Sequence, residues 1–412
     1  MDTQTLIQPP DKTRVRVFIS TGEVAGDLQG SMLIRALRQQ AATRRLELEI
    51  LAIGGDRMAS EGAILLGHSL TIGAVGIFES WPYFMPTVLM QRRVKRYLRQ
   101  HPPDLVVLID YMGPNLAMGK HIRQSLPQVP MVYYIAPQQW VWGAFTARDT
   151  RRILNVSDRL LAIFPEEARY YQEQGGHVVW VGHPLIDRIP TPPDRLTARS
   201  KLGIPAEATV VTLLPASRHQ ELKYLMPTMF KAAQQIQAKI PQVRFLAPVS
   251  LKQFHEPVEK AIQHYGLQAT RLEGQSIDAI AAADLAIAKC GTVNLEIALM
   301  NVPQVVMYKL NPISAWIAYY LLKFSAPFIS PVNLTEMKPV APEFIQWHAT
   351  PTAIAEAALE LLLNGDKRRQ MLAGYQSMRQ ALGEEGVCDR AAEEILDLLS
   401  SASGRCFDGV ST

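Results

Sequence analysis

The chain has 412 residues, of which 48% are hydrophobic and 19% charged, and its net charge is +4. This length fits two or three domains, and so small a net charge does not indicate a nucleic-acid partner. The three cysteines, Cys290, Cys388 and Cys406, are too few and too scattered for a disulfide framework or a zinc site. The sequence begins without an apolar signal core and has no strongly apolar, uncharged window of about 18 residues. These features predict a cytoplasmic globular protein without a spanning helix.

Strand-like apolar runs alternate with helical patterns, which is typical of α/β units with parallel sheets. A proline-rich stretch at Ile189–Leu196 is predicted to be a linker, and the alternation restarts after it. The sequence therefore predicts two Rossmann-like domains, 14–188 and 197–400, and the last helices are allowed to pack back on the first half. The most apolar segment, Ile313–Phe328, carries Lys323 and is expected to form a buried helix. Strands are predicted at Arg16–Ser20, Leu48–Ile53, Asp104–Asp110, Met131–Ile135, Arg159–Phe164, Val178–Val181, Val210–Leu214, Val243–Ala247, Leu285–Ala288 and Gln304–Tyr308.

Open parallel sheets bind ligands at the carboxyl ends of their strands, so the polar residues after each strand are the candidates. In the stretch LLPASRHQE, an apolar run leads into Ser217, Arg218 and Glu221 just before a helical pattern. A strand, a tight turn and a helix start form an anion site, and Arg218 adds a charged fork suited to a diphosphate. Alternatively, Ser217 and Glu221 are only helix-capping residues, with Ser217 near the N-cap and Glu221 in the first turn.

A second glycine-containing helix start, KCGTVNLE, follows the strand Leu285–Ala288. Gly291 and Thr292 open it, and Glu296 lies one turn inside, where a carboxylate can accept both hydroxyls of a ribose. Two such stretches in one half favour a nucleotide. The chain has no two aspartates separated by one residue, so a diphosphate bridged through a metal is not predicted.

In the first half, Asp110 ends an apolar strand, where a carboxylate can act as a general base or cap the next helix. The first turn, STGEVAGDLQG, carries Gly22, Glu23, Gly26 and Asp27. It lacks the spacing of a dinucleotide fingerprint, and a structural turn is as good an interpretation as a site.

Two further stretches stay open between a functional and a structural interpretation. Gln138, Trp140 and Trp142 could line a sugar or acyl site or pack between the halves, and His183 is more often structural than catalytic. The apolar and aromatic segment from Leu70 runs into a basic cluster that ends at Arg99. This pattern suits an anionic membrane surface, or a core helix with a solvated basic face.

Together these stretches resemble the lipid-A-disaccharide synthase family over about residues 17–346. Several ordered motifs carry the resemblance, and their combination is far more specific than any one of them. They are STGEVAGDLQG, GGDRMASEG, GAVGIFESWP, IDYMGPNL, YYIAPQQWVW, VGHPLID, LLPASRHQE, CGTVNLE and NLTEMKPVAPEFIQ. This family has the GT-B fold of two Rossmann-like domains facing a cleft.

The resemblance implies an inverting, metal-independent and cofactor-free transfer of a diacylglucosamine from its UDP donor to the 6-hydroxyl of an acylated glucosamine 1-phosphate acceptor. It implies that Asp110 is the catalytic base. It also implies an enzyme on the cytoplasmic face of the inner membrane, attached peripherally, with no nucleic-acid partner, and leaves a homodimer open. The implied donor residues are Ser217, Arg218, Glu221, Gly291, Thr292, Asn294, Glu296, Asn333, Glu343 and Gln346. The implied acceptor side is Gly22, Glu23, Gly26, Asp27, Gln138 and Trp140.

The sequence departs from the family pattern at Gln29, Ala216, Cys290 and the pair Met337-Lys338. The changes at Ala216 and Cys290 are small and leave the phosphate geometry intact, whereas the others bear on substrate contacts. Three alternatives therefore stay open: a diverged enzyme that glycosylates another acceptor, a UDP-sugar epimerase, and a non-catalytic binding protein on the same fold.

Overall fold

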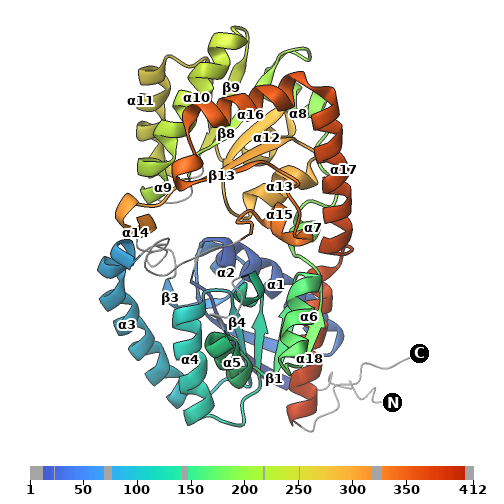
Figure 1. The fold of residues 1–412 in the computed structure, drawn as a ribbon. Helices are drawn as coiled ribbons and strands as arrows, with labels where there is room; N and C mark the ends of the chain where they lie inside the picture. Colours follow the sequence, from blue (N-terminus) through green and yellow to red (C-terminus); the bar gives the residue numbers. More distant parts are fainter. Residues whose placement is uncertain are drawn as a thin grey trace, which may run out of the picture.

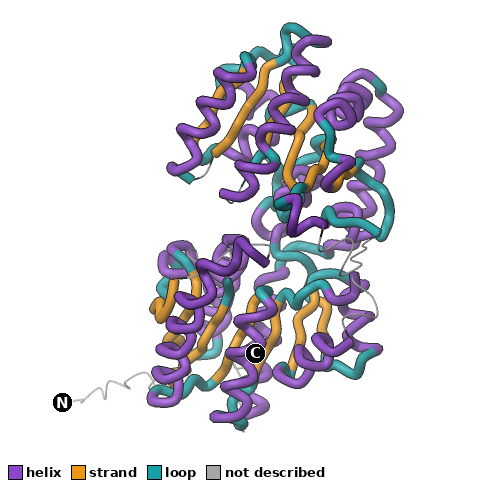
Figure 2. Tube along the Cα trace, turned by 60° about the vertical axis from the view of Figure 1, so that its left-hand side comes forward, coloured by secondary structure: helices purple, strands orange, loops and turns teal. Residues whose placement is uncertain are grey.

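The alternating pattern folds into two parallel sheets, each covered by helices on both faces, stacked one above the other (Figure 1). The computed structural model describes residues 13–22, 24–68, 77–141, 147–216, 219–249, 251–316 and 327–403. Figure 2 shows the same two layered halves from the side, with the strands sandwiched between helices. The predicted α/β class with two Rossmann-like halves is confirmed.

The first half is built on a seven-stranded parallel sheet of order β3-β2-β1-β4-β5-β6-β7. Its strands are β1 (Thr13–Ser20), β2 (Leu46–Gly54), β3 (Ile64–His68), β4 (Leu105–Ile109), β5 (Met131–Tyr134), β6 (Arg159–Ala162) and β7 (Val178–Trp180). Its helices are α1 (Val24–Thr43), α2 (Asp56–Ser60), α3 (Ile77–Gln100), α4 (Met112–Ser125), α5 (Ala147–Val156), α6 (Pro165–Glu173) and α7 (Leu185–Arg188).

The second half has a six-stranded parallel sheet of order β10-β9-β8-β11-β12-β13. Its strands are β8 (Val210–Leu214), β9 (Arg244–Val249), β10 (Ala269–Glu273), β11 (Leu285–Lys289), β12 (Gln304–Tyr308) and β13 (Glu343–Ile345). The remaining helices are α8 (Arg195–Lys201), α9 (His219–Tyr224), α10 (Met226–Lys239), α11 (His255–Tyr265), α12 (Ser276–Ala281), α13 (Val293–Leu299), α14 (Pro312–Trp316), α15 (Pro331–Glu336), α16 (Pro351–Leu363), α17 (Gly365–Leu382) and α18 (Val387–Ser403).

Central strands are apolar throughout because helices cover both of their faces. In β4 all five residues are buried; Val107 packs in the core cluster on one face, whereas Val106 and Leu108 pack in the cluster on the other. Burial of both faces holds the strand ends firmly, and the loops that follow them carry the candidate site.

The predicted strands match the interior strands of each sheet and the edge strand β7, whereas the edge strands β3, β10 and β13 were not predicted. All three lie at sheet edges, and their residues are only partly buried or exposed. An edge strand needs no continuous apolar run, so the pattern that identified the central strands is weak there. The expected buried helix at Ile313–Phe328 is wrong at its described start, because Ile313 is 61% and Trp316 55% exposed.

The chain crosses between the halves twice, and the two crossings lie side by side. The backbone N–H of His183 donates to the Leu382 carbonyl at 2.8 Å, which joins the end of the first half to the turn between α17 and α18. The Asp187 carboxylate accepts backbone N–H groups of Gly386, Val387 and Cys388 at 2.7–3.1 Å, and so caps the start of α18. Helix α18 then packs on α1, with an ion pair of 2.6 Å between Arg44 and Asp397. The last helix therefore belongs structurally to the first half.

Candidate active site

Asp110 follows the last residue of β4, at the edge of the sheet that faces the second half. Its backbone is in the left-handed region (φ +49°), as is that of Tyr111 (φ +46°), which starts α4. The Asp110 N–H donates to the carbonyl of Ile135 at 3.1 Å, across the end of β5. Two consecutive non-glycine residues in this region are strained, and such strain persists only where neighbouring contacts impose it. The half-buried Asp110 is therefore held in a defined place at the strand end.

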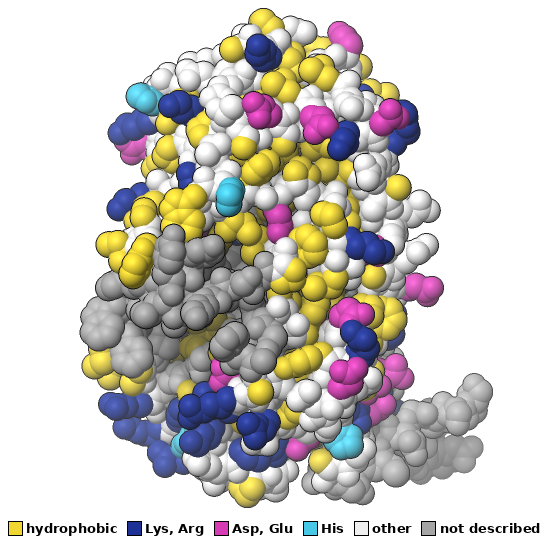
Figure 3. All heavy atoms as spheres, viewed as in Figure 1, with side chains coloured by type: hydrophobic (Ala, Val, Ile, Leu, Met, Phe, Trp, Pro, Cys, Tyr) yellow, Lys and Arg dark blue, Asp and Glu magenta, His cyan; other side chains and the backbone are white. Residues whose placement is uncertain are grey.

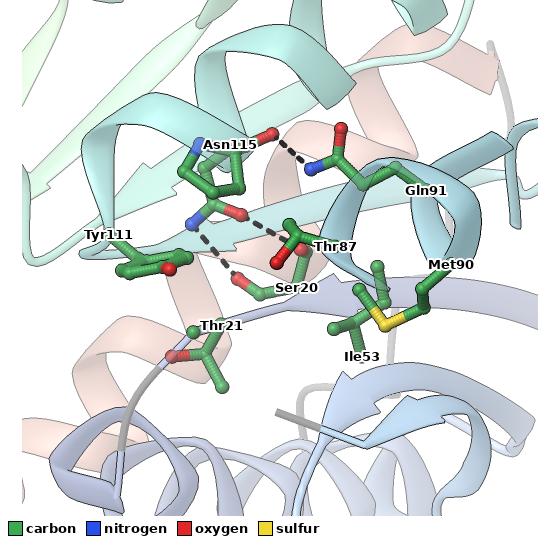
Figure 4. A pocket seen from close by; sticks show the side chains of 10 residues that line it. Ser20, Thr21, Ile53, Thr87, Met90, Gln91, Tyr111 and Asn115 are labelled. Carbon is green, nitrogen blue, oxygen red and sulfur yellow. Dashed lines mark hydrogen bonds between the residues drawn. The ribbon is translucent and has the colours of Figure 1, made fainter. Parts of the chain in front are cut away.

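Asn115 imposes this geometry from the first turn of α4 (Figure 4). Its buried side-chain amide donates to the carbonyls of Ile109 and Asp110 at 2.9 Å each and to that of Ser20 at 3.2 Å. Its amide oxygen accepts the Ser20 hydroxyl at 2.8 Å, and the Tyr133 hydroxyl donates to the Asp110 carbonyl at 2.9 Å. Asn115 was not among the predicted site residues, although it lies five residues after Asp110 in the motif IDYMGPN.

A small hollow lies between the end of β1, the start of α4 and helix α3. Its empty volume is about 220 Å³, including space open to solvent. Figure 4 shows Thr21, Thr87, Met90 and Tyr111 around it, with the Gln91 amide donating to the Pro114 carbonyl at 2.8 Å. The hollow brings Tyr111, the neighbour of Asp110 in the chain, to one cavity with Thr87, Met90 and Gln91 of α3.

The turn between β1 and α1, which carries Gly22, Gly26 and Asp27, makes close contacts within the first half. A Cβ on Gly22 would lie 1.8 Å from the Tyr111 ring, and one on Gly26 would lie 1.8 Å from the Thr21 hydroxyl oxygen. Asp27 is 3% exposed, and its carboxylate accepts the backbone N–H groups of Gly55, Arg57 and Met58 at 2.7–3.2 Å.

Asp27 thus caps α2, and both of its carboxylate oxygens accept hydrogen bonds from backbone N–H groups. They do not face the predicted site for the acceptor substrate. The glycines serve close packing, so the structural interpretation of this turn is the better one for Gly22, Gly26 and Asp27. Glu23 lies outside the described residues.

The loop after β5 places Gln138 and Trp140 half-buried next to the end of β6. The Trp140 ring lies 6.1 Å from that of Phe164, which in turn lies 5.4 Å from the His183 ring. Burial lowers the pKa of His183 to about 3, and its Nδ1 accepts the Leu185 N–H. His183 is therefore a neutral structural acceptor, as is usual for a lone histidine. Trp142 lies outside the described residues.

A buried carboxyl group, Glu167, lies behind this loop. Its Oε2 accepts the backbone N–H groups of Ile163 and Phe164 at 2.9 and 3.3 Å. Burial, with a smaller contribution from the charge of Asp110, raises its pKa to about 8 in spite of these bonds. Glu167 is therefore largely protonated at neutral pH.

In the second half, Ser217 and Arg218 lie outside the described residues. The next predicted residue, Glu221 on α9, is 2% exposed and pairs with Lys289 at the end of β11, Nζ to Oε1, at 3.5 Å. Lys289 reaches the loop that follows it, because a Cβ on Gly291 would lie 2.9 Å from its Nζ. The structure thus adds a cation, Lys289, to a site in which only Arg218 was predicted to carry positive charge.

The predicted loop residues divide into those that form the loop and those that support it. Gly291 and Thr292 are half-buried at the start of α13. Asn294 is fully buried; it accepts the Gly291 N–H at 2.8 Å and exchanges hydrogen bonds with Gln304 at 2.9 and 3.1 Å. Asn294 therefore holds the loop from below and does not face the predicted ligand.

Three further predicted donor residues also form hydrogen bonds with backbone groups: Asn333, Glu343 and Gln346. Glu343 accepts the N–H groups of Ile329 and Ser330 at 3.0 Å each and the Asn333 amide at 3.1 Å, so it binds the start of α15 to the edge strand β13. Asn333 is fully buried, and Gln346 pairs with the backbone of Leu310.

Glu296 differs from these residues because its partner comes from the other half. Its carboxylate pairs with the guanidinium of Arg188, the last residue of α7. Burial raises the pKa of Glu296, and the charges of Arg188, Arg57 and Lys289 oppose that rise. These cations stand on α7, α2 and β11, so Glu296 lies at the junction of the halves.

Among the described residues, no group of three or more histidines, cysteines or acidic residues is arranged to hold a metal ion. None of the described helices is long and apolar enough to cross a membrane.

Two Rossmann-like domains, each with a parallel sheet covered by helices on both faces, are the architecture of the GT-B fold. Solved structures share the fold: a Staphylococcus aureus MnaA–UDP co-structure has a TM-score of 0.63 at 13% identity and covers 96% of this chain and 99% of that one. The glycotransferase of kitacinnamycin has a TM-score of 0.61 at 14% identity and covers 95% of this chain and 100% of that one.

Sequence comparison gives the family. The model of the lipid-A-disaccharide synthetase family matches residues 17–396. Lipid-A-disaccharide synthases from Gloeothece citriformis and Synechocystis sp. are 56% and 54% identical; the matches cover 93% of this chain and 100% and 98% of those proteins. The chain belongs to the lipid-A-disaccharide synthase family and is a glycosyltransferase of lipid A biosynthesis, as the motifs predicted.

Proposed function

We propose that the chain moves a 2,3-diacylglucosamine unit from UDP to the 6-hydroxyl of 2,3-diacylglucosamine 1-phosphate, with inversion. The observation that carries this proposal is the placement of Asp110. A half-buried carboxylate follows the end of β4 in the first half, and Asn115 and Tyr133 hold its backbone carbonyl; the glycine loop belongs to the second half. Acceptor binding in the first half and donor binding in the second follow from that division.

In this reaction Asp110 takes the proton of the acceptor hydroxyl as its oxygen attacks the anomeric carbon of the donor sugar. The new carbon–oxygen bond forms as the bond to UDP breaks, and the electron pair leaves on the diphosphate. A positioned general base contributes about 10²–10⁴-fold to the rate. The strained, clamped backbone at Asp110 supports this role, because a base must be held close to the attacking oxygen.

The donor is proposed to lie against the loop 289–292 of the second half. The Lys289 ammonium group lies next to Gly291 of this loop, where a Cβ would be 2.9 Å from its Nζ. In this proposal it supplies positive charge for the leaving diphosphate. The predicted contacts of Ser217 and Arg218 complete the cradle in this proposal. The carboxylate of Glu296 is proposed to accept the ribose hydroxyls, whereas Asn294, Asn333, Glu343 and Gln346 hold the surrounding backbone.

The acylated substrates are proposed to reach the site along α3, with the enzyme on the cytoplasmic face of the inner membrane. Met85 and Leu89 on this helix are 60% and 57% exposed, and Val94 and Leu98 face the core. Arginine and lysine side chains gather over the lower part of α3 (Figure 3). The exposed cations in the described part of this helix are Arg92, Arg93, Arg96 and Arg99. Apolar side chains beside a basic cluster match an anionic lipid surface.

The test is to incubate the protein with the UDP-linked diacylglucosamine and the diacylated glucosamine 1-phosphate, and to follow release of UDP and formation of the disaccharide. Turnover that requires both lipids supports the proposal. UDP release without a disaccharide product, or conversion of the donor sugar to an epimer, would contradict it.

The membrane part has its own test, which is sedimentation with vesicles of anionic or of neutral lipid. Binding to the anionic vesicles that falls in Arg92→Glu/Arg96→Glu supports it. Equal binding by that variant would exclude the basic face of α3 as the contact.

A further inference from the structure

The ion pair between Arg188 and Glu296 links two residues that are 108 positions apart and lie on different halves. Glu296 is 8% exposed and sits on α13, one turn after the glycine loop of the donor site. Arg188 ends α7, immediately before the linker between the halves. A predicted ligand-binding carboxylate is thus held by a side chain from outside its own half.

The ion pair between Arg188 and Glu296 is not required to hold α7 in place. Helix α7 is already fixed by its neighbour Asp187, which accepts three backbone N–H groups at the start of α18. The pair is largely buried, with 26% of the Arg188 side chain and 10% of the Glu296 side chain exposed, and the cost of removing both charges from water offsets much of their attraction. The ion pair is therefore not needed to place α7.

The ion pair with Arg188 instead stabilises the charged form of the Glu296 carboxylate. A carboxylate buried to this degree is destabilised in its charged form, and Arg188 is the first of the cations that oppose this effect. Arg57 on α2 and Lys289 on β11 act in the same direction, but Lys289 is already paired with Glu221. Arg188 contacts Oε1 of Glu296, and a charged carboxylate keeps further acceptor positions on Oε2.

We propose that Arg188 is a positioning residue for the donor nucleotide, which orients the Glu296 carboxylate as the acceptor of the ribose hydroxyls. This inference rests on the proposed role of Glu296 in holding the UDP moiety. It makes the donor site dependent on a side chain of the first half. Nucleotide affinity then depends on how the two halves are placed.

The experiment measures the affinity of the full-length protein for UDP and for 2′,3′-dideoxy-UDP by calorimetry. We expect Arg188→Gln to weaken UDP binding about tenfold, the effect of one hydrogen bond to a charged group. The dideoxy analogue, which lacks the hydroxyls, is expected to bind the variant and the unchanged protein equally. Arg188→Lys keeps the charge and is expected to restore most of the affinity, and Arg195→Gln, which breaks a surface ion pair with Asp284, serves as the matched control.

Two further measurements separate positioning from structure. The double variant Arg188→Gln/Glu296→Gln is expected to bind UDP no more weakly than Glu296→Gln alone, because both changes remove one interaction. In Arg188→Gln the loss of affinity is expected to grow as the pH falls, because Arg57 and Lys289 alone then oppose protonation of Glu296. In steady-state kinetics the KM for the donor is expected to rise while kcat changes little.

The outcomes distinguish this inference from the proposed function. If the unchanged protein binds no UDP, the proposed function fails. If it binds UDP and Glu296→Gln weakens that binding but Arg188→Gln does not, the inference alone is overturned. Equal losses for UDP and the dideoxy analogue in Arg188→Gln would also overturn it, because the ribose contact would then not be involved.

Discussion

Asn115 and Ser20 exchange two hydrogen bonds, from hydroxyl to amide oxygen at 2.8 Å and from amide nitrogen to carbonyl at 3.2 Å. Through this pair, the first turn of α4 is fastened to the end of β1, and the same amide nitrogen holds the backbone of Asp110. One buried side chain thus fixes the ends of the two neighbouring central strands β1 and β4. The position of the candidate base depends on this contact.

Replacing Asp110 by Asn is expected to reduce turnover by about 10²–10⁴-fold with little change in UDP affinity, because the amide cannot take a proton. Turnover and calorimetric UDP binding measure the two effects. Asp104→Asn, just before the opposite end of β4, is the matched control and is expected to keep full activity. A variant Asp110→Asn with normal turnover would show that another group is the base.

Replacing Asn115 by Ala is expected to lower both stability and turnover. It removes the amide that donates to the carbonyls of Ser20, Ile109 and Asp110, at a cost of about 1–3 kcal/mol in the free energy of unfolding, although the Asp110 carbonyl keeps the Tyr133 hydroxyl. Chemical denaturation measures this change, and a kcat that falls further than the folded fraction shows that Asp110 has lost its place. Ser20→Ala removes only the bond to the amide oxygen and is expected to have the smaller effect on both. Full kcat in folded Asn115→Ala would rule out the clamp.

Replacing Asp27 by Ala is expected to destabilise the protein by about 1–3 kcal/mol, because three backbone N–H groups at the start of α2 lose their acceptor. The folded variant is expected to retain its KM for the acceptor. Asp56→Ala in the same helix removes an exposed carboxylate and is expected to change stability by less than about 0.5 kcal/mol. A raised acceptor KM in Asp27→Ala, with stability unchanged, would favour the original prediction of an acceptor contact.

Replacing Glu167 by Gln tests the raised pKa of this buried group. Since the pKa is about 8 in the folded state and about 4.5 in the unfolded state, the folded protein keeps a proton between these pH values that the unfolded chain has lost. The stability that Glu167 contributes is therefore present below pH 4.5 and falls as the pH rises toward 8, by up to about 1.4 kcal/mol per pH unit.

The glutamine variant does not titrate, so it is expected to become more stable relative to the unchanged protein as the pH rises. Urea denaturation at several pH values between 5 and 8 measures this difference. Glu166→Gln, at the half-exposed neighbouring position, is the control for the loss of a carboxyl group from the same helical turn. A stability difference for Glu167→Gln that does not change with pH would show that the group is ionised in the folded protein.

The sequence was informative where burial is continuous. Every central strand was predicted, because helices cover both of its faces and its apolar run is unbroken. The edge strands β3, β10 and β13 were missed, because their residues are only partly buried or exposed. The prediction that Asp110 ends a strand followed from the same pattern. The apolar pattern could not predict which group each polar side chain contacts in the folded protein.

The partners of the polar side chains are far away in the sequence. Asp27 caps a helix that begins 29 residues later, and Glu296 pairs with a residue 108 positions before it. Asn294 and Asn333 are fully buried, and both were predicted to meet a ligand. In each case the residue type fits a site and a structural contact equally well, and only the three-dimensional neighbours decide between them.

The two adjacent crossings between the halves have a consequence for dissecting the protein. Because α18 completes the first half, the second half is an insertion into it, entered after α7 and left before α18. Residues 13–188 alone would lack the helix that covers α1. Excision of 189–385 with a short connector, which the proximity of His183 and Leu382 permits, is the design expected to yield the first half as an independently folding unit.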